Sequence, residues 1–474
     1  MNRRIATLFS ALAIILSLSC NSWQGTQRSA DWGSLHGYSD KAIFNRRQDS
    51  RVSFKDRTRE LVDRAERLIK NNQDEGSVLD QRWYGLKYFG KHEDLIFNAA
   101  KVIFFGGLEK DVRTHLGDRY ASIDPVEENQ DSGDIRMYRG TRKDGSYDFI
   151  IVGQNGNEVA LKTIIRLLYL TKFVDGETKQ KYRDKLASFT QSLQVFLSSV
   201  SPRDEFIAFF NKYGIDKPDA VIIGFRGDIR PLMKDEGISD PESYTDESLR
   251  VNWYPDANGK RVLLVSIDKN RIFASRSGEL IEAILTITSP TYTPPSITLL
   301  GSGGAIDAPQ MVGQLVTPVS VMNGDSSLAS QDKGAVVQII RNRAAGEAAA
   351  KTSDVSVDNV LVETTKWVKK MKDSRINTVD QELFHIMKAI NTSLYAGKVK
   401  VFIGTLLTDN VSSNAQDSDM TLERAEEVIS ATAEIRREFF SKVLKTLGIL
   451  KKETKWMPGR SASLEKRPLS LPAR

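Results

Sequence analysis

The chain contains one cysteine, Cys20, among 474 residues. A lone cysteine excludes an internal disulfide framework and any zinc site built on several thiolates. Histidine is almost as rare, and the four histidines are far apart, with no His-Glu-x-x-His pair among them: His36, His92, His115 and His385. The sequence therefore predicts no metal site and no bound cofactor.

Sequence signatures of catalysis are also missing. There is no Gly-x-Ser-x-Gly motif and no phosphate-binding loop. The run Gly301-Ser302-Gly303-Gly304 lacks the third glycine of a dinucleotide fingerprint, because Ile306 stands at that position. Asp256-Ala257-Asn258-Gly259 resembles part of a calcium loop, but Ile267 occupies the position of the bidentate acid, so we interpret it as a turn. These absences predict a protein that is not an enzyme.

Beyond the first twenty residues, no apolar run reaches the roughly 20 residues that a membrane-spanning helix needs. The amino terminus itself has a positive start, Met1-Asn2-Arg3-Arg4, and an apolar run from Ile5 to Leu18 that is too short to span. This order of segments is typical of an export signal. We expect residues 1–19 to be a signal peptide that is removed.

The apolar run ends at Ser17-Leu18-Ser19-Cys20, which resembles the lipobox of bacterial lipoproteins in a relaxed form, because Ser17 replaces the usual leucine. The resemblance implies cleavage before Cys20, a diacylglyceryl group on its thiol and acylation, for example with palmitate, of the new amino terminus. Several acyl chains hold a protein on a membrane durably. The alternative is that Cys20 is an ordinary thiol at the end of an ordinary signal peptide.

Residues 20–52 are rich in Ser, Gln, Asn, Asp and Arg, which favours a flexible tether behind the lipid. Together with Arg3, Arg4 and the relaxed lipobox, this tether resembles the outer-surface lipoproteins of the Lyme and relapsing-fever spirochaetes. The resemblance implies a lipid anchor in the outer membrane, display on the cell surface and interaction with a host protein.

The other end of the chain is basic. Residues 451–474 hold seven Lys or Arg residues and two Glu residues, with Pro458, Pro468 and Pro472 among them. We expect a disordered tail that either attracts an anionic polymer or lipid head groups, or only improves solubility. Because the tail carries most of the positive charge, the body shows no nucleic-acid-binding face.

Helical spacing of apolar residues dominates residues 53–288. It predicts helices over Ser53–Asn72, His92–Phe105, Asn157–Phe173 and Thr178–Val200, and over Pro202–Tyr213 with Ser201 as the N-cap. Short β-branched runs predict strands at Asp148–Val152, Val221–Ile223 and Arg261–Ile267, and Asn258-Gly259 is typical of a hairpin turn. We expect a mostly helical domain with a small β element.

Residues 289–330 are rich in Pro, Gly, Ser and Thr, which indicates a linker or long surface loop. Helical patterns then return in residues 331–450, notably over Val355–Asp373, over Thr378–Ala396 with Asp380 as an N-cap, over Lys398–Leu407 and over Leu422–Leu447. The predicted fold is mainly α with a few short β-strands or hairpins: a helical N-terminal domain and a C-terminal helix bundle.

One aromatic cluster stands out, formed by Trp83, Tyr84, Tyr88 and Phe89. Exposed aromatic side chains anchor interfaces, so the cluster could be a binding surface, and core packing is the alternative.

The sequence thus predicts a lipid-anchored, surface-displayed protein with a non-catalytic binding role. The alternative is a periplasm-facing lipoprotein that binds a solute or has an enzymatic or structural role in the envelope.

Overall fold

A computed structural model describes residues 52–77, 89–126, 135–170, 189–246, 249–266, 274–288, 292–306, 312–324, 336–338, 350–411 and 428–451. The chain divides between Val52 and Ser53, and the fold described below belongs to the unit Ser53–Arg474. Within the described residues, no helix combines the length and the apolar character that crossing a membrane would require.

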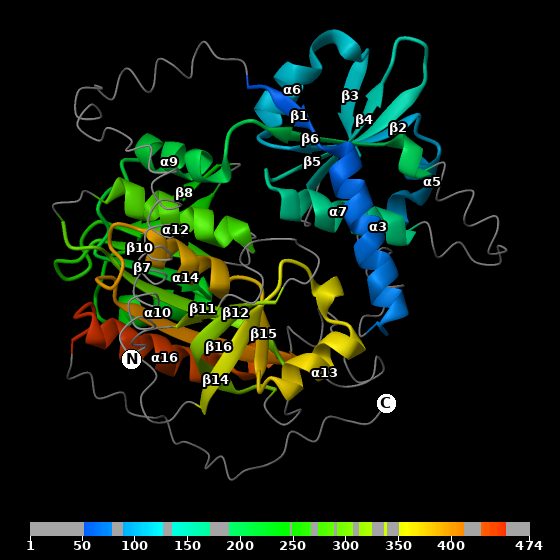
Figure 1. The fold of residues 1–474 in the computed structure, drawn as a ribbon. Coiled ribbons are helices and arrows are strands. Elements are labelled where there is room, and N and C mark those ends of the chain that lie inside the picture. The colour runs from blue at the N-terminus through cyan, green and yellow to red at the C-terminus, as the bar shows by residue number, and fades with distance from the viewer. Residues whose placement is uncertain are drawn as a thin grey trace, which may run out of the picture. The chain divides into compact units, whose positions relative to one another are not determined.

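Two large sheets form the framework of this unit (Figure 1). The prediction of a mainly α fold with a C-terminal helix bundle was wrong, because six strands form one sheet and ten strands form the other. The fold is a mixed α/β fold in which helices cover sheets.

The first sheet has a parallel centre and antiparallel edges. Strands β6, β2 and β5 are parallel, whereas β1 pairs antiparallel with β6, and β4 and β3 continue antiparallel from β5. The order is β1 (Phe54–Asp56), β6 (Leu193–Ser198), β2 (Lys101–Gly106), β5 (Tyr147–Gly153), β4 (Ile135–Thr141) and β3 (Ser122–Pro125).

Both faces of this sheet are covered. Val102 and Phe104 of β2 pack into a core that includes α3 (Thr58–Asp74) and α7 (Asn157–Leu170), while Ile103 and Phe105 pack into a second core with α6 (Glu109–Leu116). A short helix, α5 (Glu93–Phe97), precedes β2. Alternate side chains of one strand point to opposite faces, so a strand covered on both sides is apolar at every position.

The second sheet contains a closed ring of strands. Strand β16 (Val401–Asn410) pairs with both β11 and β12, so β11, β16, β12, β14 and β15 form a five-stranded barrel. From β11 an open sheet continues through β7, β10, β9 and β8, and β13 pairs with β12. The bounds are β7 (Ala220–Gly224), β8 (Glu242–Thr245), β9 (Arg250–Tyr254), β10 (Val262–Ser266), β11 (Ser296–Ala305), β12 (Leu315–Asn323), β13 (Val336–Gln338), β14 (Ala350–Ser356) and β15 (Thr378–Asp380).

Helices cover both faces of the open part. Val221 and Ile223 of β7 pack in one core with α9 (Pro202–Lys212), α12 (Ser275–Ile287) and α14 (Leu383–Thr392). Ala220 and Ile222 pack in another core with α10 (Arg226–Asp235) and α16 (Ala433–Thr446). The remaining helix, α13 (Thr365–Asp373), follows a 3-10 turn at Val360–Val362, where Asn72 Nδ2 of α3 donates to Leu361 O at 2.9 Å.

Several segments that were expected to be helical or irregular are strands. The expected linker 289–330 contains β11 and β12, the expected helix Thr178–Val200 contains β6, and the expected helix Lys398–Leu407 contains most of β16. The expected helices starting at His92 and Val355 are divided between short helices and strands. A short apolar run does not show by its period whether it is a buried strand or a buried helix, and the tertiary structure decides between them.

The glycines of β11 allow this strand to belong to both the open sheet and the barrel. Residues Ser296–Leu299 pair with β7, whereas Gly304 and Ala305 pair with β15. A Cβ atom on Gly303 would lie 2.6 Å from Val379 O, and one on Gly304 would lie 2.7 Å from a methyl group of Val411. The register with β16 also shifts between these two glycines. The glycine run resembles a linker in the sequence, but in the structure it is part of a strand and allows a close approach of the neighbouring chain segments.

We predict that Gly303→Ala lowers the free energy of unfolding by about 1–3 kcal/mol, because the added methyl group overlaps the backbone of β15. Urea denaturation measures the change. The control is Gly301→Ala, because a Cβ atom there meets nothing within 4 Å. We expect this control to be neutral or slightly stabilising. Equal stability of the two variants would contradict the close contact.

Candidate functional site

Acidic side chains gather where β14 and β15 end. These strands are parallel, and their last residues, Ser356 and Asp380, lie side by side. Ser356 Oγ donates to Asp380 Oδ1 at 2.5 Å, and Leu383 N at the start of α14 donates to Asp380 Oδ2 at 3.1 Å. The carboxyl ends of parallel strands are a common place for binding sites. Asp380 therefore joins the strand end to the helix start. The N-cap position of α14 is occupied by Glu382, so the predicted N-cap at Asp380 was wrong by two residues.

A second buried acid contacts Asp380. Asp354 accepts a hydrogen bond from Thr378 Oγ1 at 2.6 Å, and both carboxyl groups are buried, with 1% and 8% of Asp354 and Asp380 exposed. Burial raises the pKa of Asp380 to about 6, and it raises the pKa of Asp354 further, with the charge of Asp380 as the next cause. Two neighbouring carboxyl groups that lack water favour sharing one proton.

Beyond the strand ends lies a histidine held by an acid. His385 Nε2 of α14 is 2.8 Å from Asp358 Oδ1, and Arg64 Nη2 of α3 is 3.8 Å from the other oxygen of Asp358. Asp358 is buried, whereas the His385 side chain is 16% exposed. A carboxylate that binds one nitrogen of an imidazole orients the ring and determines which nitrogen carries the proton.

Helix α7 adds an acid and a base. Burial raises the pKa of Glu158, and the negative charge of Asp358 raises it further. Burial lowers the pKa of Lys162 to about 7, assisted by the positive charge of Arg166, while Glu382 opposes this change. Glu382 itself has a pKa raised to about 8, first by burial and then by the charge of Asp380.

The start of α12 holds these groups together. Ser275 donates its side-chain hydrogen bond to Glu158, and Ser277 Oγ donates to Glu382 O at 3.2 Å. Arg276 Nη1 donates to Asn155 O, just before α7, at 2.9 Å. Helices α7, α12 and α14 therefore begin at one place, next to the ends of β14 and β15.

We name six of these residues the acid–base cluster: Glu158, Lys162, Asp358, Asp380, Glu382 and His385. Glu158, Lys162, Glu382 and His385 are partly exposed, whereas Asp358 and Asp380 are buried. Groups with a pKa between about 6 and 8 exchange protons readily at neutral pH, which is the property of a general acid or base. The arrangement can donate a proton from one group and accept one at another.

Within the described ranges, no three or more His, Cys, Asp or Glu side chains are arranged to hold a metal ion.

The residues selected from the sequence do not form this cluster. Phe89 is fully buried in the core with α3 and α7, which is the core-packing alternative. The other three aromatic residues, Trp83, Tyr84 and Tyr88, lie outside the described residues, as do Ser17, Leu18, Ser19 and Cys20. The sequence analysis missed Glu158, Lys162, Asp358 and Glu382. The available signal was the set of charged residues at helix starts, which is usually explained by helix capping.

No protein-family model matches the chain, and a search of curated proteins found no match. Solved structures do resemble it. A 5'-methylthioadenosine/S-adenosylhomocysteine nucleosidase from Neisseria meningitidis is 15% identical, with a TM-score of 0.36, over 48% of this chain and 98% of the nucleosidase. Futalosine hydrolase of Helicobacter pylori is 11% identical, with a TM-score of 0.38, over 49% of this chain and 99% of the hydrolase. A methylthioadenosine phosphorylase from an antarctic soil metagenomic library is 12% identical, with a TM-score of 0.35, over 49% of this chain and 87% of the phosphorylase.

These similar structures are enzymes, which contradicts the expectation that the chain is not an enzyme. The absence of sequence motifs was a poor guide, because motifs such as the nucleophile elbow report only some reaction types. At these TM-scores the similarity assigns neither an activity nor a substrate.

The pKa of Glu382 predicts how stability depends on pH. The folded chain keeps this proton up to a pH of about 8, whereas the unfolded chain releases it near the ordinary value of 4.5. Between these values the folded state binds more protons, so stability falls as pH rises. One such group contributes at most about 1.4 kcal/mol per pH unit. We predict that Glu382→Gln makes the decline between about pH 5 and pH 8 shallower.

Urea denaturation at several pH values measures this slope. The matched control is Glu434→Gln on α16, where the side chain is exposed, and its slope should equal that of the wild type. If Glu382→Gln and the wild type lost stability equally with pH, the protonated state of Glu382 at neutral pH would be refuted.

Proposed function

We propose that the body of this protein is an enzyme that cleaves a bond in a small polar substrate by general acid–base catalysis in the acid–base cluster. The observation that carries this proposal is the state of Glu382. Burial beside Asp380 raises the pKa of Glu382 to about 8, while the residue keeps contact with solvent. A carboxyl group that stays protonated at neutral pH can donate its proton to a leaving group.

The same cluster supplies the groups for the remaining proton transfer. In this proposal the His385 imidazole, oriented by Asp358 at 2.8 Å, accepts a proton from an attacking water or hydroxyl group. Lys162, with a pKa lowered to about 7, lies near enough to Glu382 to lower the pKa of Glu382, and it returns the proton that Glu382 loses. His385 then releases its proton to solvent, and Lys162 takes one up from solvent. The reaction class is hydrolysis or a related transfer in which a leaving group needs protonation.

Nucleosides are the first substrate class to test. This choice follows the names of the similar structures, a nucleosidase, a futalosine hydrolase and a phosphorylase, and it adds no weight to the argument from the cluster. Release of the base from 5'-methylthioadenosine or futalosine, followed by chromatography with and without phosphate, distinguishes hydrolysis from phosphorolysis.

For activity, we predict that Glu382→Gln lowers kcat at least about 100-fold, because an amide cannot donate the proton. Glu434→Gln, an exposed control, should keep the wild-type rate. A pH profile of kcat for the wild type should fall above a pH of about 8, as Glu382 loses its proton. An active wild type with an equally active Glu382→Gln variant would refute the role of the cluster.

We further propose that this enzyme is exported and held on a membrane by lipid on Cys20. The support is the order of segments at the amino terminus: Arg3 and Arg4, the apolar run Ile5–Leu18, and Ser19 before the lone cysteine. A flexible tether over residues 20–52 would let the body reach solutes beyond the lipid head groups. Display on the cell surface is the second part of this proposal.

Detergent-phase partitioning tests the anchor. We predict that the wild type enters the detergent phase and that Cys20→Ala stays in the aqueous phase, because the variant lacks the acyl chains. Protease treatment of intact cells tests the surface location, and digestion of the wild type is the expected result. Identical partitioning of the two proteins would refute the lipid anchor, and survival of the protein on intact cells would place it on the inner side of the outer membrane.

A further inference from the structure

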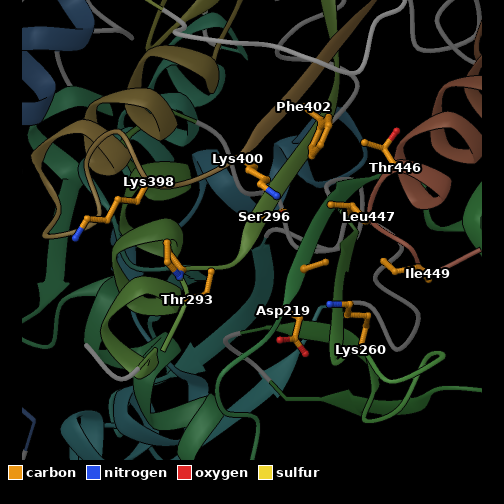
Figure 2. Close-up of a pocket in the computed structure, with 12 residues that line it drawn as sticks. Asp219, Lys260, Thr293, Ser296, Lys398, Lys400, Phe402, Thr446, Leu447 and Ile449 are labelled. Carbon is orange, nitrogen blue, oxygen red and sulfur yellow. The ribbon is translucent and has the colours of Figure 1, made fainter. Parts of the chain in front are cut away.

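A pocket of about 310 Å³ lies where three parallel strands begin. Ala220 starts β7, Ser296 starts β11 and Phe402 lies at the start of β16, and all three line this pocket (Figure 2). Pro294 and Leu447, the latter just after the end of α16, are partly exposed and form its apolar side. The volume is within the range of small-molecule pockets in proteins.

Hydrogen bonds of the backbone hold the walls in place. Ser296 N donates to Asp219 O at 3.0 Å, and Ile297 N donates to Lys400 O at 2.8 Å. Asn258 Nδ2, in the turn between β9 and β10, donates to Ile449 O at 2.7 Å and so joins that turn to the end of α16. The pocket is therefore formed before any ligand binds.

The polar rim of the pocket is positive. Three lysines, Lys260, Lys398 and Lys400, are among the lining residues. Figure 2 shows Lys260 and Lys400 directed toward the space that the labelled residues surround, while Lys398 points away from it. Among the described lining residues, Asp219 is the acid. Asp219 Oδ2 accepts a hydrogen bond from the backbone nitrogen of Arg261 at 2.8 Å, and it lies 3.5 Å from Nε of the Arg261 guanidinium. Its charge is thus already balanced by Arg261.

We propose that this pocket binds a small organic anion, with its phosphate or carboxylate group held by Lys260 and Lys400 and its apolar part against Pro294 and Leu447. Two ammonium groups beside an apolar wall match a ligand that has one charged end and one apolar end. None of these residues belongs to the acid–base cluster, so the binding site is independent of the proposed catalysis.

Phenyl phosphate is a suitable probe, because it joins a phosphate to one aromatic ring. Calorimetric titration of the full chain should show binding to the wild type. We expect the double variant, Lys260→Gln with Lys400→Gln, to lower the affinity for phenyl phosphate at least about tenfold, because two charged donors are lost. The control, Lys369→Gln with Lys370→Gln, removes the same charge from exposed positions on α13 and should bind like the wild type.

A second variant, Thr293→Glu, places a negative charge at an exposed position in the lining and should also weaken binding. Inorganic phosphate and phenol, tested separately, should each bind more weakly than phenyl phosphate. Binding that is unchanged in the double lysine variant overturns the site, and equal affinity for inorganic phosphate overturns the apolar contact. Glu382→Gln should leave this binding unchanged, so the two proposals can fail separately.

Discussion

The close approach of β15 to the glycines of β11 is the contact on which the second sheet depends. Gly303 and Gly304 have no side chain, so β11 can leave its pairing with β7 and pair with β15 within a few residues. Without this change of partner the ring of β11, β16, β12, β14 and β15 would stay open. The position of β15 in turn determines where Asp380 and Glu382 lie, so the acid–base cluster also depends on Gly303 and Gly304.

Burial gives the cluster its chemical character. Taking a carboxyl group or an amine out of water favours the neutral form, which raises the pKa of Glu382 and lowers that of Lys162. Both effects cost stability, and the packing of α7, α12 and α14 against the sheets offsets that cost. Partial exposure is equally important, because a group that exchanges protons with a substrate must be reachable. The place where α7, α12 and α14 begin gives these side chains both burial and partial exposure.

The second sheet carries two different electrostatic environments. The acid–base cluster follows the ends of β14 and β15, where hydrogen bonds connect Asp380 and Ser356 to the start of α14. The lysine-lined pocket stands where β7, β11 and β16 begin. The two sites rest on different strands of this sheet, because β14 and β15 pair in the barrel, whereas β7 pairs with β11 in the open part.

The sequence by itself determined the helices with a clear 3.6-residue period, such as α3, the helix α9 with its N-cap Ser201, and the turn at Asn258-Gly259, where both residues have a positive φ. Only the tertiary structure decided that the segments at Ser296–Ala305 and Val401–Asn410 are strands, because an apolar segment buried on both faces has no period to reveal its conformation. The cluster was hidden for a related reason: Glu158, Asp358 and Glu382 are far apart in sequence, and the abnormal pKa of a carboxyl group comes from the side chains that surround it in space.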